Sequence, residues 1–327
     1  MKKINWGILG AGKIANKFAN DLKLVEDATL VAVASRDDAK GNEFAAQYGI
    51  PVVFNTYEAL ASSPEIDVIY VATPHSFHRE HTLLCLNHGK AVLCEKAFAL
   101  NSREVSDMVR VAREKKIFLM EAFWTKFLPQ FDKVRQLIAE DAIGDIRWIQ
   151  ADFGFISDPP APRLFDPGLG GGSLLDIGIY PVFLAQTLLG VPKHVQATIV
   201  PFSSGVDQQC SITFTYDNGA MASLFSTLTA DTPVEAVIAG TKGRIEMRNR
   251  FHNAVGKLFL IGDKDEPKEI EVYRESGYGY QFEARHVTAC LQKGLTESPI
   301  MTLDDSIQLI KTLDNIRRVA GIKYSVD

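Results

Sequence analysis

Residues 4–15 read INWGILGAGKIA, and this stretch decides the fold. Its first half is apolar, as expected of a buried strand, and its second half is a GxGxxA pattern that opens a helix. The first glycine of such a pattern permits a tight turn, the second lets the backbone approach a pyrophosphate, and the small third residue allows close helix packing. The helix N-terminus then offers its N–H groups to the phosphates. The pattern predicts a dinucleotide site formed by Gly10, Ala11, Gly12, Lys13 and Ile14; a glycine-rich turn without a ligand is the alternative.

Working outward from this loop, short apolar runs alternate with single amphipathic stretches through the first 120 residues. Strands that are apolar on both faces and are separated by helices indicate a parallel sheet covered on both sides. The expected strands are INWGILG, TLVAVAS, VVF, DVIYVAT, KAVLCEK and IFLMEA, and the expected helices span residues 13–24, 38–48, a short stretch near 57, 76–87 and 102–115. The sequence therefore predicts an α/β fold whose N-terminal domain, residues 1–122, is a doubly wound Rossmann sheet.

Beyond about residue 145 the rhythm changes to strands with few helices between them. Eight strands are expected, beginning with DIRWIQADFGFI and ending with KEIEVYR, and Asn218-Gly219 is the signal of a tight hairpin. Long helices are expected at residues 173–189 and 303–319. The second domain, residues 123–327, is predicted to be α+β with a large, mostly antiparallel open sheet.

The composition of the 327 residues excludes several classes of protein. The net charge is −5, with 46% hydrophobic and 23% charged residues, which argues against an electrostatic grip on nucleic acid or on an anionic membrane. No apolar run approaches the ~20 residues needed to span a bilayer, and the N-terminal stretch lacks a cleavage-like site. The four cysteines are widely spaced and form no CxxC pair, as expected of reduced thiols. We expect a cytoplasmic protein that binds neither nucleic acid nor membrane.

The end of the second expected strand indicates which dinucleotide is bound. An acid at this position would hold the ribose 2'-hydroxyl of NAD, but the sequence has Ser35-Arg36. A hydroxyl and a guanidinium suit a 2'-phosphate. NADP is therefore favoured, while NAD stays possible because Asp37 lies next to this pair. The other alternative is that Arg36 is merely solvated.

Charged residues also follow the fifth expected strand, where Val92, Leu93 and Cys94 lead to Glu95 and Lys96. Ligands of open parallel sheets lie beyond the carboxyl ends of the strands, so both side chains are expected in the cofactor crevice. The lysine could bond the nicotinamide ribose and a substrate oxygen, and the glutamate could balance its charge. Thr73-Pro74, after the fourth strand, would wall the same crevice. An exposed ion pair at a strand end is the alternative for Glu95 and Lys96.

Three segments carry a family resemblance. VATPHSFH, KAVLCEKAFALN and MEAFWTKFLP resemble the glucose-fructose oxidoreductase and inositol dehydrogenase family (Gfo/Idh/MocA), and the last two resemble its dimeric dihydrodiol dehydrogenase branch. The resemblance implies a Rossmann fold, a nicotinamide cofactor and a catalytic role for Lys96, the lysine of the family's Glu-Lys-Pro motif. Ala97 replaces that proline, and His75 stands where many members have asparagine. Among the residues of these segments, the expected cofactor contacts are Thr73, Pro74, His75, His78, Glu95, Lys96 and Trp124.

A tyrosine in the helix expected after the Gly170-Gly171-Gly172 hinge is the second catalytic candidate. Asp176 and Tyr180 are four residues apart and would project from one helix face, while Pro181 would break the hydrogen-bond ladder and kink the helix. A phenol has a free pKa near ~10, which a neighbouring ammonium such as that of Lys96 would lower. The alternatives are a Ser173–Asp176 capping box and a core tyrosine. The resemblance implies the catalytic role, because Asp-x-Gly-x-Tyr matches the branch's tyrosine acid/base.

Other polar and aromatic residues are weaker candidates. Trp124, Arg163 and Tyr280 could contact substrate; a junction-filling tryptophan and a solvated loop arginine are the alternatives, and His286 would share the helix of Tyr280 without a catalytic role. The triplet HxxHxxH at residues 75–81 invites a metal interpretation, but its first histidine follows a proline in a turn and no carboxylate or thiolate completes the set. No metal is expected.

Together these observations predict an NADP-dependent oxidoreductase that transfers hydride between nicotinamide C4 and a carbonyl or hydroxyl of a small sugar, trans-dihydrodiol or dicarbonyl. Tyr180 would act as acid/base, Lys96 would assist it, and Asp176 would orient it. One alternative is a non-catalytic NAD(P)-binding regulator of the same fold. Another is an NAD-dependent inositol-type dehydrogenase, which would prefer an acid at position 35 and histidine at position 180. A homodimer or larger homo-oligomer is expected through a sheet face that carries Ile212, Phe214 and Tyr216.

Overall fold

A computed structural model describes residues 2–157, 161–262, 265–324 and 326–327. The chain packs into two compact units. The first unit runs to Phe127 and includes Ser276–Ile307; the second comprises Leu128–Glu275 and Gln308–Asp327. The predicted domain boundary at residues 122 and 123 stays a prediction, because packing density does not show which part of a chain folds as a domain.

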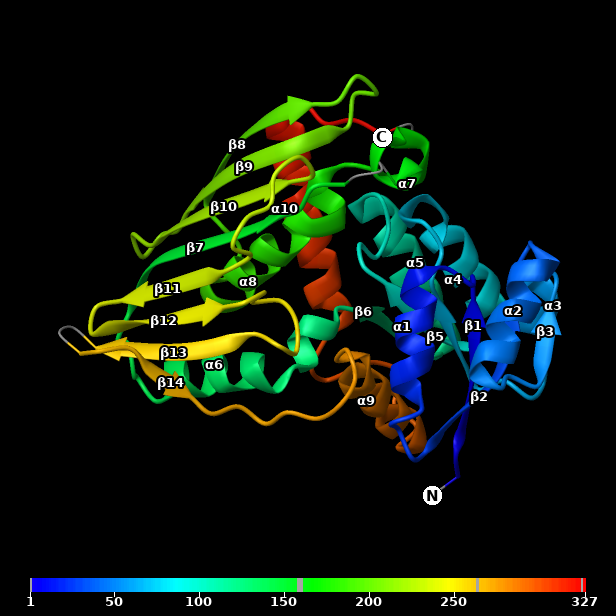
Figure 1. Ribbon diagram of the computed structural model, residues 1–327. Coiled ribbons are helices and arrows are strands. Elements are labelled where there is room, and N and C mark those ends of the chain that lie inside the picture. Colours follow the sequence, from blue (N-terminus) through cyan, green and yellow to red (C-terminus); the bar gives the residue numbers. More distant parts are fainter. Residues whose placement is uncertain (1, 158–160, 263–264, 325) are drawn as a thin grey trace. The chain divides into compact units, whose positions relative to one another are not determined.

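The first unit contains the predicted parallel sheet of six strands (Figure 1). Its strand order is β3-β2-β1-β4-β5-β6, the Rossmann order, and all its pairings are parallel. The strands are β1 (Ile4–Leu9), β2 (Ala28–Ala34), β3 (Val52–Phe54), β4 (Val68–Val71), β5 (Ala91–Glu95) and β6 (Leu119–Ala122). The central strands β4 and β5 are buried along their whole length, which explains why their sequences are continuously apolar.

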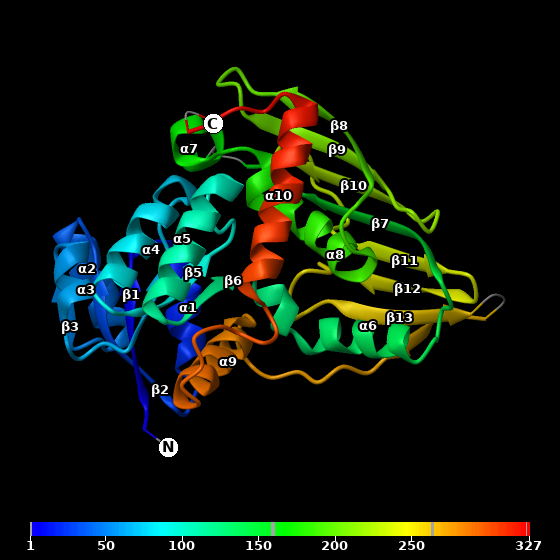
Figure 2. The same cartoon turned by 180° about the vertical axis from the view of Figure 1, so that it is seen from behind.

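Helices cover both faces of this sheet (Figures 1 and 2), with α1 packed on α9 and α4 packed on α5. The helices of the unit are α1 (Lys13–Leu22), α2 (Asp38–Tyr48), α3 (Tyr57–Ser62), the 3₁₀ turn η1 (His75–Phe77), α4 (His78–Asn87), α5 (Ser102–Lys115), the 3₁₀ turn η2 (Trp124–Phe127) and α9 (Tyr280–Gln292). The fold class predicted for the N-terminal part is confirmed.

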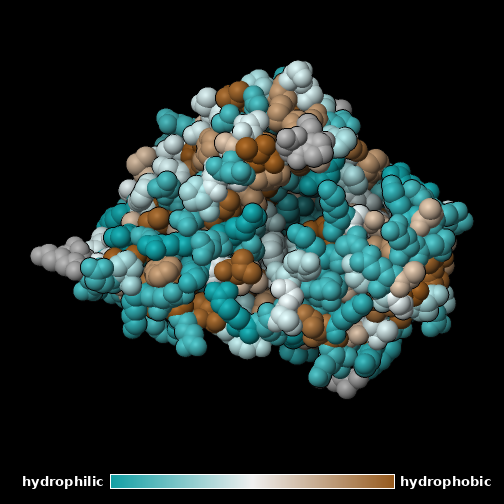
Figure 3. All heavy atoms as spheres, viewed as in Figure 1, coloured by the Kyte–Doolittle hydropathy of each residue, from teal (hydrophilic) through white to brown (hydrophobic). Residues whose placement is uncertain are grey.

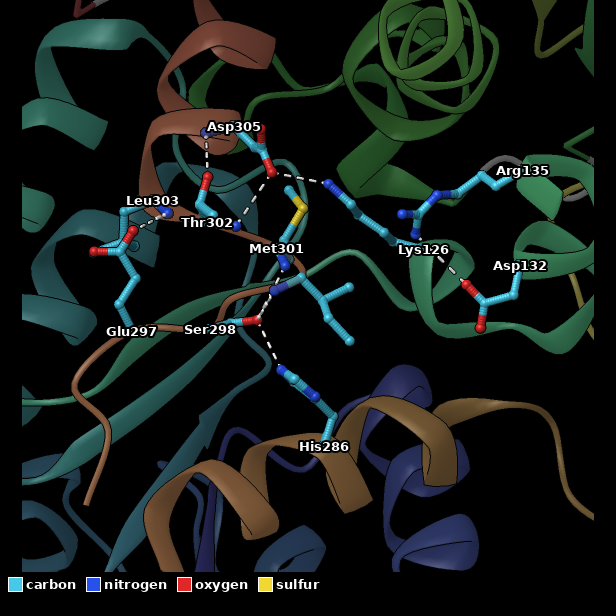
Figure 4. Close-up of polar contacts among 11 residues, drawn as sticks. Lys126, Asp132, Arg135, His286, Glu297, Ser298, Met301, Thr302, Leu303 and Asp305 are labelled. Carbon is cyan, nitrogen blue, oxygen red and sulfur yellow. Dashed lines mark hydrogen bonds and ion pairs between the residues drawn. The ribbon is translucent and has the colours of Figure 1, made fainter. Parts of the chain in front are cut away.

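Polar side chains order the returning segment Ser276–Ile307 internally, and one ion pair joins it to the rest of the unit (Figure 4). Ser298 Oγ lies 2.7 Å from His286 Nε2 and accepts hydrogen bonds from the backbone of Ile300 and Met301. Lys126 Nζ lies 2.9 Å from Asp305 Oδ2. Burial lowers the pKa of His286 to about 4, so the ring is neutral and its contact with Ser298 is structural.

The second unit is built on an eight-stranded sheet in the order β14-β13-β12-β11-β7-β10-β9-β8. Every pairing is antiparallel except that of β7 with β10, so the prediction of a mostly antiparallel sheet is confirmed. The strands are β7 (Ile146–Gly154), β8 (His194–Pro201), β9 (Asp207–Thr215), β10 (Met221–Thr227), β11 (Ala236–Gly240), β12 (Gly243–Arg248), β13 (Lys257–Gly262) and β14 (Lys268–Ile270). The Asn218-Gly219 turn joins β9 to β10, with Gly219 at φ +80° as the hairpin requires.

One face of this sheet is covered by helices, which Figure 2 shows in front of the strands. The helical elements are α6 (Pro129–Ala139), α7 (Pro162–Phe165), the 3₁₀ turn η3 (Pro167–Leu169), the π-helix η4 (Leu174–Gly178), α8 (Ile179–Leu189) and α10 (Leu303–Ala320), which begins in the first unit. Helix α6 was not predicted. Ile212, Phe214 and Tyr216 are 2%, 0% and 7% exposed, so the expectation that they form a free sheet face was wrong: they point into the core.

The stretch Pro167–Leu189 is long and apolar enough to cross a membrane by length and composition alone. However, 78% of its most apolar window is buried inside the protein. This burial is what a core helix of a globular unit shows, and the high hydropathy of α8 follows from packing under the sheet.

Candidate active site

The loop between β1 and α1 has the shape that a dinucleotide pyrophosphate needs. Gly10 has φ +101°, and a Cβ there would lie 3.2 Å from Ala72 O and from Thr73 Cγ2, so this loop presses against the end of β4. Gly12 is the N-cap residue of α1, and among the described residues no side chain caps that helix end and no acidic residue lies in its first turn. The predicted loop residues thus leave the N–H groups of a ten-residue helix available to an anion at the switch point between β1 and β4.

Three adjacent polar residues at the end of β2 make different contacts. Ser35 is buried, and its hydroxyl donates to Asp37 O at 2.9 Å. Asp37 caps α2 by accepting from Lys40 N at 3.1 Å, and this contact is the first reason that the pKa of its carboxyl is lowered. Arg36 is exposed, with its guanidinium carbon 5.8 Å from the ring centre of Tyr57 and 5.7 Å from that of Phe77. The acid beside Arg36 is therefore engaged in capping a helix.

Histidines connect the loops that follow β4 and β5. His78 is fully buried, with Nε2 2.7 Å from Thr73 O and Nδ1 2.8 Å from Ala97 O. Burial lowers the pKa of His78 to about 4, and a neutral imidazole donates only one of these two hydrogen bonds. His81 Nδ1 lies 3.0 Å from Thr73 Oγ1. These ring nitrogens are engaged by protein groups, and His75 is buried at the start of η1 just after Pro74.

The end of β5 places Glu95 and Lys96 at the carboxyl edge of the sheet, as predicted. Glu95 is 6% exposed and accepts a short hydrogen bond from the hydroxyl of Tyr70. Burial raises the pKa of Tyr70 well above its usual value, so the phenol keeps its proton and donates it to the carboxylate. Lys96 is half-buried, and the peptide bond that joins it to Ala97 is cis. An exposed ion pair is thus the wrong interpretation for Glu95.

A buried carboxyl group supports the loop that carries Lys96. Glu121 lies on β6 opposite Cys94, and its Oε1 accepts from Phe98 N at 3.1 Å. Burial raises the pKa of Glu121 to about 7, and the nearby charge of Lys96 opposes the rise. Two residues beyond the lysine, the backbone is therefore held by a group that titrates near neutral pH.

Two of the predicted substrate contacts stack on each other within the first unit. The rings of Trp124 and Tyr280 are 4.7 Å apart and nearly parallel, at 1°. Tyr280 begins α9, and its backbone N–H donates to Asp21 at 2.9 Å, as do those of Tyr278 and Gly279. The buried Asp21 thus fixes the position of this aromatic pair.

In the second unit, Tyr180 follows a π-helical turn, η4, instead of lying within one continuous α-helix. Pro181 falls in the first turn of α8, where its missing N–H breaks no α-helical bond. The predicted proline kink is therefore replaced by a change of helix type just before Tyr180. The capping-box alternative was also wrong: Ser173 does not cap this helix, and its hydroxyl donates to Asp207.

Tyr180 is 6% exposed and lies in an aromatic cluster with Phe153 and His252. Its ring centre is 5.6 Å from that of Phe153 and 4.8 Å from that of His252, and the latter two stack at 4.2 Å. These contacts restrict the rotation of the Tyr180 ring.

Asp176 and Arg163, predicted separately, form one ion pair. Arg163 Nη1 lies 2.8 Å from Asp176 Oδ1, and the aspartate side chain is 9% exposed while that of the arginine is 51% exposed. Arg163 is therefore exposed, as the solvated-arginine alternative expects, but its guanidinium is paired with Asp176. The predicted meeting of Lys96 with Tyr180 stays a prediction, because the two residues belong to different units.

Sequence reasoning missed Phe153, His252, Asp207, Glu121 and Asp21. Phe153 could have been suspected, because it lies at an inward position of the alternating strand β7. The other four are polar residues that are buried by partners far away in the sequence, and they carry no local signal.

Family profiles match both parts of this chain. Residues 4–123 match the "Oxidoreductase family, NAD-binding Rossmann fold" and residues 131–246 match the "GFO/IDH/MocA C-terminal domain". The chain belongs to the Gfo/Idh/MocA oxidoreductase family. Like other members of this family it is a nicotinamide-dependent oxidoreductase, and its relatives act on small molecules with hydroxyl or carbonyl groups.

Two relatives within the Gfo/Idh/MocA family cover nearly the whole chain. A trans-1,2-dihydrobenzene-1,2-diol dehydrogenase of Xenopus laevis is 41% identical over 327 residues, which cover 98% of each chain. The human protein of that name is 35% identical over 334 residues, covering 99% of each chain. The resemblance to this branch is thereby confirmed.

Solved structures show the same architecture. The aldose-aldose oxidoreductase of Caulobacter crescentus has a TM-score of 0.89 at 26% identity, and the 3-ketoreductase KijD10 of Actinomadura kijaniata, in complex with NADP and TDP-benzene, has a TM-score of 0.87 at 26% identity. Both matches cover 98% of each chain.

Proposed function

We propose that this protein is an NADP-dependent oxidoreductase that interconverts a hydroxyl and a carbonyl group on a small sugar, a trans-dihydrodiol or a sugar-derived dicarbonyl. The observation that carries the proposal is the full-length similarity to trans-1,2-dihydrobenzene-1,2-diol dehydrogenases, together with Lys96 at the end of β5 and Tyr180 after η4. Sugars are included among the candidate substrates because the aldose-aldose oxidoreductase shares the fold over 98% of each chain.

In the reducing direction, a bound reduced nicotinamide would supply the hydride that the carbonyl carbon of the substrate accepts. The hydroxyl of Tyr180 donates a proton to the carbonyl oxygen, and the ammonium of Lys96 stabilises the charge that develops on this oxygen. Asp176, held by Arg163, fixes the polar side of the turn that leads to Tyr180. Trp124, stacked on Tyr280, offers a rigid apolar wall to the nicotinamide or the substrate. The oxidation uses the same groups in reverse.

The choice of NADP rests on the end of β2. Arg36 presents its guanidinium beside two aromatic rings, where it can pair with a 2'-phosphate, and Ser35 lies next to it. Asp37, the acid that would favour NAD, is engaged in capping α2. Gly10, Ala11, Gly12, Lys13 and Ile14 would hold the phosphates, and Thr73, Pro74 and His75 with Glu95 and Lys96 would line the nicotinamide side. His78, which is fully buried, would act on this side only through its contact with Thr73.

The protein is further inferred to be a cytoplasmic homodimer or larger homo-oligomer that pairs through the outer face of the eight-stranded sheet. Trp148 and Met221 are neighbours in register on β7 and β10 and are 37% and 44% exposed. In Figure 3 hydrophobic residues lie in small groups within a mostly hydrophilic face. Trp148→Glu should halve the mass measured by light scattering; an unchanged mass would remove this face from the interface.

Absorbance of the reduced nicotinamide at 340 nm tests the proposed activity. Purified protein is incubated with NADP or NAD and a panel of aldoses, trans-dihydrodiols and inositols, and with NADPH and dicarbonyls. Turnover of a dihydrodiol, sugar or dicarbonyl with NADP(H) is expected. Binding of NADPH without turnover of any compound would favour a regulator, and turnover of inositols with NAD alone would favour the inositol-type enzyme.

A further inference from the structure

The π-helical turn before Tyr180 is held from outside by a buried carboxyl group. Asp207, the first residue of β9, has no exposed surface. Its Oδ2 accepts a hydrogen bond from the Ser173 hydroxyl and another from the backbone N–H of Leu174, each at 2.7 Å. The Ser173 hydroxyl also lies 2.9 Å from that of Ser226 on β10. Two neighbouring strands thus bind the start of this turn.

Glycines at both ends of the turn allow the strands to approach. Gly172 has φ +111°, and a Cβ there would lie 2.2 Å from Asp207 Oδ1. A Cβ at Gly178 would lie 2.8 Å from the hydroxyl oxygen of Ser226. The sequence therefore leaves space at two positions where the polar side chains of β9 and β10 touch the helix backbone.

A third contact reaches the same backbone from the C-terminal residues. The hydroxyl of Tyr324 donates to Gly171 O at 2.6 Å. The Asp207 carboxyl also interacts electrostatically with the hydroxyl of Tyr324 and with the thiol of Cys210 on the same strand. Burial raises the pKa of both groups, so both are uncharged at neutral pH.

Charged groups lie one residue further away from the Asp207 carboxyl: the guanidinium carbon of the buried Arg317 is 4.6 Å from the ring centre of Tyr324, and Arg317 pairs with Asp327. Burial raises the pKa of Asp207 to about 6, while the Ser173 and Leu174 donors oppose the rise. Its Oδ1 has no hydrogen-bond partner among the described residues. Such a group is a costly way to fill a core position, because a well-packed apolar side chain would avoid the desolvation.

What the carboxyl group provides is the geometry of the turn. A π turn contains one residue more than an α turn, and one residue corresponds to about 100° of rotation about a helix axis. If residues 174–178 relaxed to α-helical geometry, the side chains before and after that turn would change their relative direction by about this angle. Asp176 lies inside the turn and Tyr180 lies just beyond it.

We propose that Asp207 is a positioning residue for the reaction: by accepting from Ser173 and Leu174 it holds the π-helical turn that aims Asp176 and Tyr180. The consequence for turnover rests on the proposed function, whereas the consequence for the backbone does not.

The test compares Asp207→Ala and Asp207→Asn with the control Asp217→Asn, an exposed aspartate in the turn after the same strand. Once the substrate panel has identified a turned-over compound, Asp207→Ala should lower kcat by ~10-fold or more and leave the KM for the cofactor within ~2-fold. Asp207→Asn should restore most of kcat, since the amide oxygen accepts both hydrogen bonds.

Hydrogen exchange of the amides of residues 174–180 gives a readout that needs no substrate. Faster exchange in Asp207→Ala than in wild type and Asp217→Asn is expected. Wild-type kcat in a folded Asp207→Ala, or equal kcat losses in Asp207→Ala and Asp207→Asn, would overturn the proposal while the proposed function stands. If no compound is turned over, the proposed function fails. In that case, unchanged hydrogen exchange in Asp207→Ala would contradict the positioning role of Asp207. If Asp207→Ala does not fold, Ser173→Ala decides: faster exchange supports the role, and unchanged exchange contradicts it.

Discussion

The segments that carry Lys96 and Tyr180 are each held by a buried carboxyl group that accepts a backbone hydrogen bond, but the two carboxyl groups come from different places in the fold. In the first unit, the carboxyl of Glu121 accepts from the N–H of Phe98 just after Lys96; in the second unit, that of Asp207 accepts from the N–H of Leu174 before Tyr180. Glu121 lies on the strand adjacent to the lysine's own strand, in register with Cys94. Asp207 comes from a strand 33 residues further along the chain and holds a turn that is not α-helical. The comparison teaches that the Lys96 loop follows from sheet topology, whereas the Tyr180 turn depends on tertiary contacts.

The largest expected effect comes from removing the proton donor of the second unit. Tyr180→Phe should lower kcat by ~10² or more, because the carbonyl oxygen loses its acid, while the affinity for NADPH stays nearly unchanged. Steady-state kinetics and a fluorescence titration measure the two quantities. Tyr273→Phe, which alters an exposed tyrosine of the same unit, is the control. Near-normal turnover of Tyr180→Phe would remove this residue from the mechanism.

The first unit could be predicted from the sequence almost element by element. Strands buried on both faces and the GxGxxA loop are local patterns, so the Rossmann sheet, the glycine turn between β1 and α1 and the ends of α2 and α5 could be predicted. In the second unit the strands were predicted, but α6, the π-helical turn and the burial of Ile212, Phe214 and Tyr216 were not. Which face of a sheet is covered depends on helices that are distant in sequence, and a π turn carries no periodicity of its own.

A substitution in the first unit tests the preference for NADP over NAD. Arg36→Ala should weaken NADP binding by ~10-fold or more and NAD binding by less than ~2-fold, because only NADP carries the 2'-phosphate. Isothermal titration with both dinucleotides measures this, and Arg110→Ala on the exposed face of α5 serves as the control. Equal losses for both dinucleotides would contradict the assignment of Arg36.

The close approach of Gly172 to Asp207 in the second unit predicts that a larger residue at position 172 lowers the stability. Gly172→Ala should lower the free energy of unfolding by ~3 kcal/mol or more, because the new Cβ meets Asp207 in addition to the strain at positive φ. Gly219→Ala is the matched control: its φ is also positive, but nothing lies within 4 Å of the added Cβ, so only ~1 kcal/mol is expected. Thermal unfolding compares the two. Similar losses would show that the contact with Asp207 yields easily.

The smallest expected effect is a change of stability with pH that comes from the Glu121 carboxyl. The pKa of Glu121, about 7 in the folded protein, lies above its ordinary value of 4.5, so its contribution to stability is present at low pH and is lost as the pH rises through about 7. Between pH 5 and pH 8 the wild type should lose about 1–3 kcal/mol relative to Glu121→Gln, whose amide oxygen still accepts from Phe98.

Melting temperatures at four pH values, with the exposed Glu114→Gln as a control, measure this difference. A difference between the wild type and Glu121→Gln that does not change with pH would mean that the Glu121 carboxyl keeps one charge state over this range.

The central claim is that Lys96 and Tyr180 act in one proton-transfer step, and a double-mutant cycle tests it most directly. The kcat of Lys96→Met, Tyr180→Phe and the double variant is compared with that of the wild type on the substrate found in the panel. The account predicts that the double variant is hardly slower than the slower single variant, since either substitution already disables the step. Losses that multiply in the double variant would contradict the account, because they would show that the amine and the phenol act independently.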